Sequence, residues 1–428
     1  MITAFAAILL ALAAMAVHAE DEFKFDASEF DKKPYEFGGY LEQKLETLKL
    51  RNDSPAYKLA YPGEEGRDWL NRSTTTLELA GKASYASITA DLRARASHAV
   101  DPLVSTTQYG QVMEGGLRWS AGPELTFDAG KRVQRWGKGY AWNPVGFVER
   151  PKDPADPLAS REGFVMAGGE WTKSLQGSIS AIALTGLIVP TNDNLNTDFG
   201  KKQDLNPAAK LYLLAFDTDI DLLWRGKGAR PQSFGLDFSR NLTPALEVHG
   251  EWARTLDANR STLNSNERLS SESVSANAWL LGTRYITTGE ITWIAEYYRN
   301  GAGYSPSELE TYYTFLDKAL ANNAAPAIAD KARSISQSGY GKANPGQDYL
   351  YLKASVNEPF EWLYGSAALT AMSNLGDHSW QIQPELSYTG FSNWELRGRV
   401  IFFGGPQQTE FTSKASRQRL EIYGRYFF

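Results

Sequence analysis

Residues 88–97 read ITADLRARAS, and side-chain polarity changes at every position of this stretch. One set of alternate positions is apolar or small and the other is polar or charged: Ile88, Ala90, Leu92, Ala94 and Ala96 against Thr89, Asp91, Arg93, Arg95 and Ser97. A period of two residues is that of a β-strand, whose successive side chains point to opposite faces of a sheet. The stretch therefore predicts a strand with one apolar and one charged face.

The same alternation recurs along most of the chain. Eighteen segments show it: 35–51, 73–83, 86–98, 109–120, 124–134, 163–173, 175–188, 207–216, 219–225, 231–240, 244–256, 274–287, 290–300, 347–357, 361–373, 377–389, 392–404 and 417–428. A charged face on nearly every strand does not fit the dry core of a sandwich, whereas a barrel with lipid outside and water inside solvates both faces. We therefore predict an all-β fold, a closed antiparallel transmembrane β-barrel of about eighteen strands.

The connections between these segments alternate in length. Short ones occur at 121–123, 217–218, 241–243, 288–289 and 390–391, and long ones at 52–72, 135–162, 189–206, 257–273 and 301–346. Such alternation indicates short periplasmic turns, long extracellular loops and two periplasmic termini. Segment 219–225 is short for a strand, and Pro384 within 377–389 predicts a bulge, because proline has no N–H to pair.

Composition excludes several classes of protein. The chain has 428 residues, no cysteine, four histidines, 22% charged residues, a net charge of −6 and a mean hydropathy of −0.40. It holds no run of about eighteen apolar residues, which excludes a bundle of membrane helices. The missing cysteines exclude disulfides and thiolate metal sites, and the scattered histidines make a metal site unexpected. We predict no cofactor, no metal and no nucleic-acid partner.

Residues 1–19, MITAFAAILLALAAMAVHA, carry no charged side chain and end in the small-residue pattern Val17-His18-Ala19. This predicts a secretory signal peptide, although the usual basic start is missing. Residues 20–34 form an acidic periplasmic lead-in, or simply a solvated tail, and 35–428 form the barrel. The alternative for 1–19 is a buried N-terminal helix.

The chain ends in LEIYGRYFF, residues 420–428, with an aromatic last residue. Leu420, Ile422, Tyr426 and Phe428 resemble the assembly signal of Gram-negative outer-membrane barrels, with the usual glycine displaced to Gly424. The overall design is similar to porin-like, eighteen-stranded barrels for organic-solute uptake and for polysaccharide export. The resemblance implies the outer membrane of a Gram-negative bacterium and contacts with lipid, lipopolysaccharide and the barrel-assembly machinery. It supplies no diagnostic motif for one subfamily.

Loop 135–162 reads RWGKGYAWNPVGFVERPKDPADPLASRE. Its three glycines and four prolines predict a rigid, turn-rich loop. As the third long loop it matches the position at which porins fold a loop inward, so we expect a constriction lined by Trp136, Lys138, Tyr140, Trp142, Phe147 and Arg150. The alternative is a loop packed on the rim. Asp153 and Asp156 could ligate Ca²⁺, but two carboxylates between prolines more often form a turn.

Loop 301–346 contains a helix signal. Ser305 is a candidate N-cap, Pro306 suits the first turn, and Glu308 completes a capping box. Apolar residues then follow at helical spacing as far as Leu320. The sequence predicts a helix that plugs or roofs the mouth, or a surface loop for phage or partner contact.

The alternation rule places eight arginines on the inner face: Arg93, Arg95, Arg118, Arg132, Arg397, Arg399, Arg419 and Arg425. Five acids are interleaved with them: Asp91, Glu114, Asp128, Glu395 and Glu421. One interpretation is a ladder of salt bridges that keeps the lumen charges paired. The other is a basic wall that attracts anionic solutes, with the acids holding the arginines in place.

Catalysis has little support in the sequence. His249 faces inward beside Glu247 and Glu251, so a catalytic triad is conceivable, but a lone histidine in a lumen is more often just solvated. No G-x-S-x-G motif accompanies it. We therefore predict no enzyme, but a channel for polar and, with a basic wall, anionic organic solutes. The alternative is the barrel component of a larger outer-membrane assembly for export, surface polysaccharide or electron transfer, without free conductance.

Overall fold

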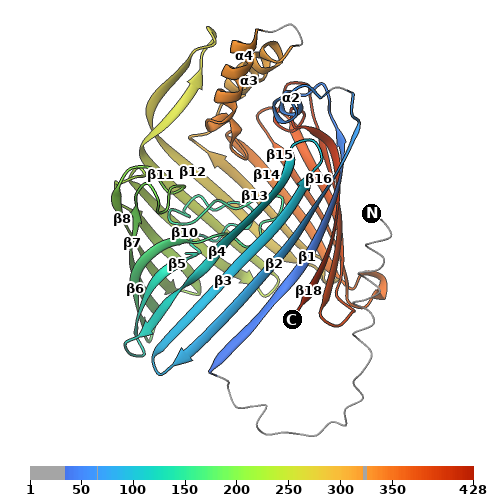
Figure 1. The fold of residues 1–428 in the computed structure, drawn as a ribbon. Coiled ribbons are helices and arrows are strands. Elements are labelled where there is room, and N and C mark those ends of the chain that lie inside the picture. The colour runs from blue at the N-terminus through green and yellow to red at the C-terminus, as the bar shows by residue number, and fades with distance from the viewer. Residues whose placement is uncertain (1–33, 65, 322–324) are drawn as a thin grey trace.

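The computed structural model describes residues 34–64, 66–321 and 325–428, so the expected signal peptide and nearly all of the lead-in lie outside the described residues. Eighteen antiparallel strands form one sheet (Figure 1). They are β1 Tyr35–Leu50, β2 Trp69–Tyr85, β3 Ile88–Asp101, β4 Ser105–Ser120, β5 Leu125–Arg132, β6 Phe164–Ser174, β7 Ile179–Thr191, β8 Asp204–Ala215, β9 Thr218–Arg225, β10 Ser233–Thr243, β11 Leu246–Leu263, β12 Leu269–Ile286, β13 Thr292–Asn300, β14 Asp348–Asn357, β15 Gly365–Asn374, β16 Ser379–Tyr388, β17 Trp394–Gly404 and β18 Ser416–Phe427. Each predicted segment corresponds to one of them.

The sheet closes on itself. Each strand pairs with the next along the chain, and β1 pairs with β18 as well as with β2, for example at Tyr40↔Phe427 and Tyr40↔Glu78. Closure gives every strand two neighbours, which satisfies the backbone hydrogen bonds that hydrocarbon cannot. The predicted closed barrel is confirmed. No helix in the described ranges is long and apolar enough to cross a bilayer.

The outer surface of the barrel is apolar. Large aliphatic side chains at alternate strand positions, among them Leu92, Leu117, Leu281, Leu386 and Ile422, each expose between 50% and 59% of their surface. Exposed aromatic residues gather near one rim: Tyr85, Trp119, Tyr285, Trp293, Tyr364, Phe391 and Phe428. An apolar band bordered by aromatic residues is the exterior of a transmembrane barrel.

The two rims differ as the sequence predicts. The rim with the C-terminus carries only short links, such as 86–87, 216–217 and 244–245, whereas the opposite rim carries 51–68, 133–163 and 301–347. Two connections differ from prediction. The link between β3 and β4 is only 102–104, and 257–273 is mostly an extension of the β11–β12 hairpin above the barrel (Figure 1).

The predicted bulge at Pro384 is wrong. Pairing between β16 and β17 stops at Ile382↔Phe402 and resumes at Glu385↔Arg399 in the same register. The missing proline N–H interrupts the ladder, but no residue is inserted.

The predicted helix of the 301–346 loop is confirmed as α3, Pro306–Ala319, with Ser305 as N-cap and the capping box to Glu308 in place. Two further α-helices were not predicted, namely α2, Pro55–Ala60, and α4, Pro326–Ser336, and neither were the short 3-10 helices Gly339–Gly341 and Pro359–Glu361. Pro326 looks like a helix stop in the sequence. In the structure it occupies the first turn of α4, where its missing N–H costs nothing.

Candidate functional site

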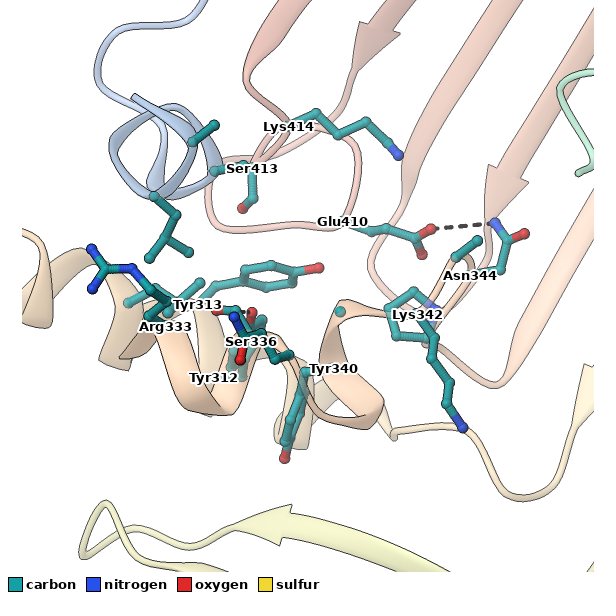
Figure 2. Close-up of a pocket in the computed structure, with 18 residues that line it drawn as sticks. Tyr312, Tyr313, Arg333, Ser336, Tyr340, Lys342, Asn344, Glu410, Ser413 and Lys414 are labelled. Atoms are coloured by element: carbon teal, nitrogen blue, oxygen red, sulfur yellow. Dashed lines mark hydrogen bonds between the residues drawn. The ribbon is translucent and has the colours of Figure 1, made fainter. Parts of the chain in front are cut away.

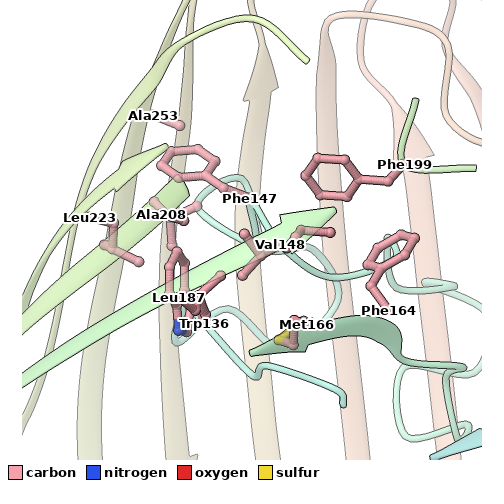
Figure 3. Packing of buried hydrophobic residues seen from close by; sticks show 12 residues of the cluster. Trp136, Phe147, Val148, Phe164, Met166, Leu187, Phe199, Ala208, Leu223 and Ala253 are labelled. Atoms are coloured by element: carbon pink, nitrogen blue, oxygen red, sulfur yellow. The ribbon is translucent and has the colours of Figure 1, made fainter. Parts of the chain in front are cut away.

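Loop 133–163, between β5 and β6, runs through the interior of the barrel (Figure 3). Trp136, Val145, Phe147 and Val148 of this loop pack against residues on the inner face of the wall and in a neighbouring loop: Phe164, Met166, Leu187, Val189, Phe199, Ala208, Leu223 and Ala253. Burial of each large apolar side chain contributes about 1.5–3 kcal/mol. The loop therefore has an apolar anchor along one side of the lumen.

A buried carboxylate on β11 fixes the start of the loop. Glu251, only 3% exposed, accepts backbone hydrogen bonds from Lys138 at 2.7 Å, Gly139 at 2.6 Å and Val145 at 3.2 Å. Backbone N–H groups that donate to a charged acceptor form stronger bonds than neutral pairs. Glu251 thus holds a whole turn of the loop against the wall.

Glu296 on β13 continues this arrangement. Its carboxylate accepts the backbone N–H of Tyr140 and, at 2.8 Å, that of Ala141, and it contacts His249 Nε2 at 2.9 Å. The other ring nitrogen of His249 lies 3.1 Å from Glu247. Carboxylates therefore occupy both ring nitrogens, and the arrangement is one that orients a loop rather than one that activates a hydroxyl.

Two glycines allow the loop backbone to lie close to the Glu251 carboxylate and to fold tightly on itself. Gly137 has a φ of +96°, and a Cβ there would lie 2.6 Å from a Glu251 oxygen. A Cβ on Gly139 would lie 2.2 Å from the carbonyl oxygen of Trp142. Larger residues at either position would push the loop off its carboxylates.

Two aromatic residues of the loop, Tyr140 and Trp142, pack on the opposite wall. Trp142 stacks on Tyr298 with centroids 5.1 Å apart, and Tyr349 and Tyr351 complete its surroundings. Lys353 donates to the Tyr140 hydroxyl at 2.9 Å. These contacts lie on β13 and β14, far around the barrel from β5.

The far end of the loop reaches β16 and β17. The Ala155 carbonyl accepts from Gln383 at 3.2 Å and from Arg399 at 3.3 Å, and Asp156 lies 3.5 Å from both Arg397 and Arg399. The loop thus crosses the lumen, with attachments on both sides of it.

Between these ends lies a buried acid. Glu149 accepts from the Asn143 amide and forms a 2.6 Å ion pair with Arg161, within the same loop. Burial raises the pKa of Glu149 to about 7, although Arg161 and Lys152 act in the opposite direction. Docking therefore raises the protonated fraction of Glu149 near neutral pH above that of a solvent-exposed glutamate.

Comparison with solved structures identifies the architecture. No protein-family profile and no curated protein matches the sequence. Solved structures match over nearly the whole chain at 10% identity: OpdQ of Pseudomonas aeruginosa (TM-score 0.53, 92% of this chain and 99% of that one), OccK11 of the same species (0.52, 92% and 95%) and OccAB3 of Acinetobacter baumannii (0.50, 92% and 99%). These are Gram-negative outer-membrane porins. The chain has the porin fold. At this identity the likeness concerns the fold alone.

Within the porin fold, the six residues expected at the constriction fall into three groups. Lys138 and Tyr140 line a lumen cavity of about 640 Å³, and Lys138 pairs with Asp221 at 3.0 Å. Trp136, Trp142 and Phe147 are at most 7% exposed, because they anchor the loop instead of facing solutes. Arg150 pairs with Glu162 at 2.9 Å and lies over the Phe164 ring.

The eight inward arginines of the porin wall all have carboxylate partners. The pairs are Arg93–Glu114, Arg95–Glu78, Arg118–Asp128, Arg132–Asp91, Arg397–Asp156, Arg399–Glu421, Arg419–Glu421 and Arg425–Glu42. Glu42, Glu78 and Asp156 were not among the acids expected there. The geometry favours the salt-bridge ladder over a wall of free positive charge.

The candidate Ca²⁺ ligands are otherwise engaged. Asp153 caps the N–H of Ala155 at 2.9 Å, and Asp156 faces the two arginines of β17. In the described part of the chain, no group of three or more His, Cys, Asp or Glu residues is placed to hold a metal ion.

Sequence reasoning missed the residues that dock the loop. Glu251 was considered only as a catalytic partner of His249, and Glu296, Asp221 and Asp237 were not singled out. All four are at most 3% exposed. Strand alternation shows that they face inward, but it carries no information on which loop amide or ammonium group meets them.

Proposed function

We propose that this porin barrel is an outer-membrane channel for small polar organic solutes, with loop 133–163 as its constriction. The observation that carries the proposal is the path of that loop: it crosses the lumen and is held on β11, β13 and β17 by buried charged groups. A cavity of about 640 Å³ beside it is lined by polar groups that include Lys138, His249 and Arg284. The closed wall and the apolar exterior support placement in the membrane.

The paired arginines are assigned to the pore lining. Guanidinium groups held by carboxylates still offer N–H donors to passing solutes, but their charge is largely compensated. We therefore expect weak charge selectivity, with anion preference only where a local surplus of arginine remains. Such selectivity fades as ionic strength rises, because charges are screened over about 10 Å at 0.1 M salt.

Single-channel recording in planar bilayers tests the proposal. Deletion of residues 136–150, with a short glycine linker in their place, should raise conductance severalfold while the barrel still shows heat-modifiable migration in gels. Unchanged conductance would mean that the loop does not limit the pore.

A second candidate function is a structural one. Helices α3 and α4 lie above the rim between the β11–β12 hairpin and α2 (Figure 1), and loop 133–163 crosses the lumen. This arrangement also suits a plugged barrel within an assembly for export, surface polysaccharide or electron transfer. Absence of conductance from both the unmodified protein and the loop deletion would favour this role. Neither candidate includes catalysis, and both include contacts with lipopolysaccharide and with the barrel-assembly machinery at Phe428.

A further inference from the structure

The lipid-facing wall of the barrel carries a long apolar groove, called here the outer groove. Its volume is about 750 Å³, and it crosses β13, β14, β15, β16, β17 and β18. The cavity between α2, α3 and loop 405–415 differs from it in character (Figure 2). That cavity is smaller, at about 490 Å³, and polar groups line it, among them Glu410 in a hydrogen bond with Asn344. The outer groove is therefore the larger of the two, and hydrocarbon rather than water surrounds it.

The register of the strands shows how the outer groove is built. Its upper side is one row of opposed, outward-facing residues: Trp293, Ala354, Leu369, Pro384, Val400 and Leu420. Its lower side is the next outward row along the same strands: Val356, Ala367, Leu386, Gly398 and Ile422. Outward residues of one strand are two positions apart, which is about 6.8 Å. The outer groove is therefore a trough between two parallel rows of side chains.

Small residues make the outer groove deep. Ala354, Ala367 and Gly398 contribute little side-chain volume, whereas Leu369 and Leu386 beside them expose 51% and 55% of their surface. A Cβ added to Gly398 would meet no heavy atom within 4 Å, so the space over this glycine is open. Apolar atoms that line an open trough lack contact partners on that side. The shape of the outer groove therefore suits a narrow apolar chain.

The outer groove rises from one rim into the apolar band. Trp293 lies at the start of β13, near the rim that carries the C-terminus, whereas Leu420 lies well inside β18. Neighbouring strands are about 4.8 Å apart, so a row from β13 to β18 is about 24 Å long. Because the strands of such barrels tilt by about 35–45°, a row across them climbs about 15 Å. That height equals one leaflet of a hydrocarbon core about 30 Å thick.

The lower end of the outer groove has an acidic border. Links 287–291 and 358–364 flank β13 and β14 at that rim and contain Glu290, Glu358 and Glu361. All three side chains are exposed, and neither link contains a lysine or an arginine. Charges at a membrane surface act on headgroups within a screening length of about 10 Å. The border therefore favours a headgroup with an ammonium group over one with a net negative charge.

We propose that the outer groove binds one acyl chain of a phosphatidylethanolamine from the periplasmic leaflet. The chain lies between the two rows and contacts both of them, whereas a flat wall would contact it on one side only. The ethanolamine ammonium lies beside the glutamates of the two links, and Trp293 marks the boundary between hydrocarbon and headgroups. The site faces lipid, so it does not depend on whether the lumen conducts.

Native mass spectrometry of the full chain tests this site. The protein is reconstituted into vesicles with equal amounts of phosphatidylethanolamine and phosphatidylglycerol and is then extracted in mild detergent. A phospholipid should be retained on the barrel, with phosphatidylethanolamine enriched about threefold or more over phosphatidylglycerol.

Filling the outer groove should remove the lipid. Gly398→Leu places a side chain in the open space and should lower retention by about fivefold or more, because the chain loses its contacts with one row. Ala367→Leu fills the trough on another strand and should act in the same way. Gly186→Leu is the matched control: Gly186 lies between the exposed Leu184 and Ile188 of β7, outside the outer groove, and a Cβ there also meets open space. Its retention should equal that of the unmodified protein.

The headgroup is tested by the triple variant Glu290→Gln, Glu358→Gln and Glu361→Gln, which should lose the preference for phosphatidylethanolamine and keep the total amount of retained lipid. Absence of retained phospholipid on the unmodified protein, unchanged retention in Gly398→Leu and Ala367→Leu, or an equal loss in Gly186→Leu overturns the site. A mass of two chains that Gly398→Leu abolishes assigns the outer groove to a second copy and also overturns it. Equal retention of both lipids by the unmodified protein overturns the assignment to phosphatidylethanolamine. Heat-modifiable migration of each variant shows that its barrel is folded.

Discussion

Replacing Glu251 by alanine should release the first turn of the constriction loop while leaving the barrel intact. In the structure one carboxylate accepts three loop N–H groups, from Lys138, Gly139 and Val145. The strand that carries it keeps its own backbone pairs with β10 and β12. The substitution therefore removes an attachment point of the loop without disrupting the strand pairing of the barrel wall.

The magnitude follows from those three bonds. Hydrogen bonds to a charged group each contribute about 1.5–3 kcal/mol net, or about 4.5–9 kcal/mol for three. Alanine also removes the cost of burying a carboxylate, which is several kcal/mol. A net loss of about 2–4 kcal/mol remains, which changes the ratio of docked to undocked loop by about 30-fold to 1,000-fold.

Single-channel recordings should show this change directly. The unmodified channel should hold one steady level, whereas Glu251→Ala should spend much of the record at a higher level with frequent steps. Glu395→Ala is the control: it also removes an inward-facing charge from the wall, but Glu395 pairs with Arg425 of β18 and makes no contact with the loop amides. Identical traces for the unmodified protein and both variants would refute the reasoning.

Three further predictions concern the loop and the wall. Gly139→Leu should raise conductance as Glu251→Ala does, because the Cβ of the leucine cannot fit against the loop backbone. A steady current at the conductance of the unmodified protein would contradict this. Glu149 has a pKa raised to about 7 in the docked loop, so docking of the loop should weaken as pH rises from about 4.5 to 7 and should change little above that range. Open-channel noise recorded as a function of pH measures this weakening, and Glu149→Gln should remove the pH dependence. Arg399→Gln should lower the free energy of unfolding by about 3–5 kcal/mol, because the fully buried Glu421 loses its closest partner. In a gel-shift melting assay, the double variant with Glu421→Gln should recover much of that loss.

Much of the fold follows from local pattern. Each predicted strand is present because a two-residue period with a lipid face and a water face can be satisfied only on a barrel wall. The α3 helix was predictable because its capping box, Ser305 with Glu308, lies within four consecutive residues. Helix α4 was missed since Pro326 reads equally well as the end of one helix or the start of the next.

The constriction was predictable in part. The glycines, prolines and aromatic residues of 135–162 indicate a rigid inward loop, but the sequence does not show that Trp136 and Phe147 are buried as anchors. Their position depends on an apolar patch made by several strands of the inner wall. No single segment contains that patch, so no local period could reveal it.

The sequence by itself determined the number of strands, the face of each side chain and the assignment of the rims, because those depend on residues one or two positions apart. The tertiary structure decided which charges pair and where the loop docks. Arg95 meets Glu78 through the register between β2 and β3, and Glu251 meets amides more than a hundred residues earlier in the chain. Register and loop path are settled by the sum of contacts around the closed barrel, and for that reason the paired lumen and the outer groove emerge only when the barrel closes.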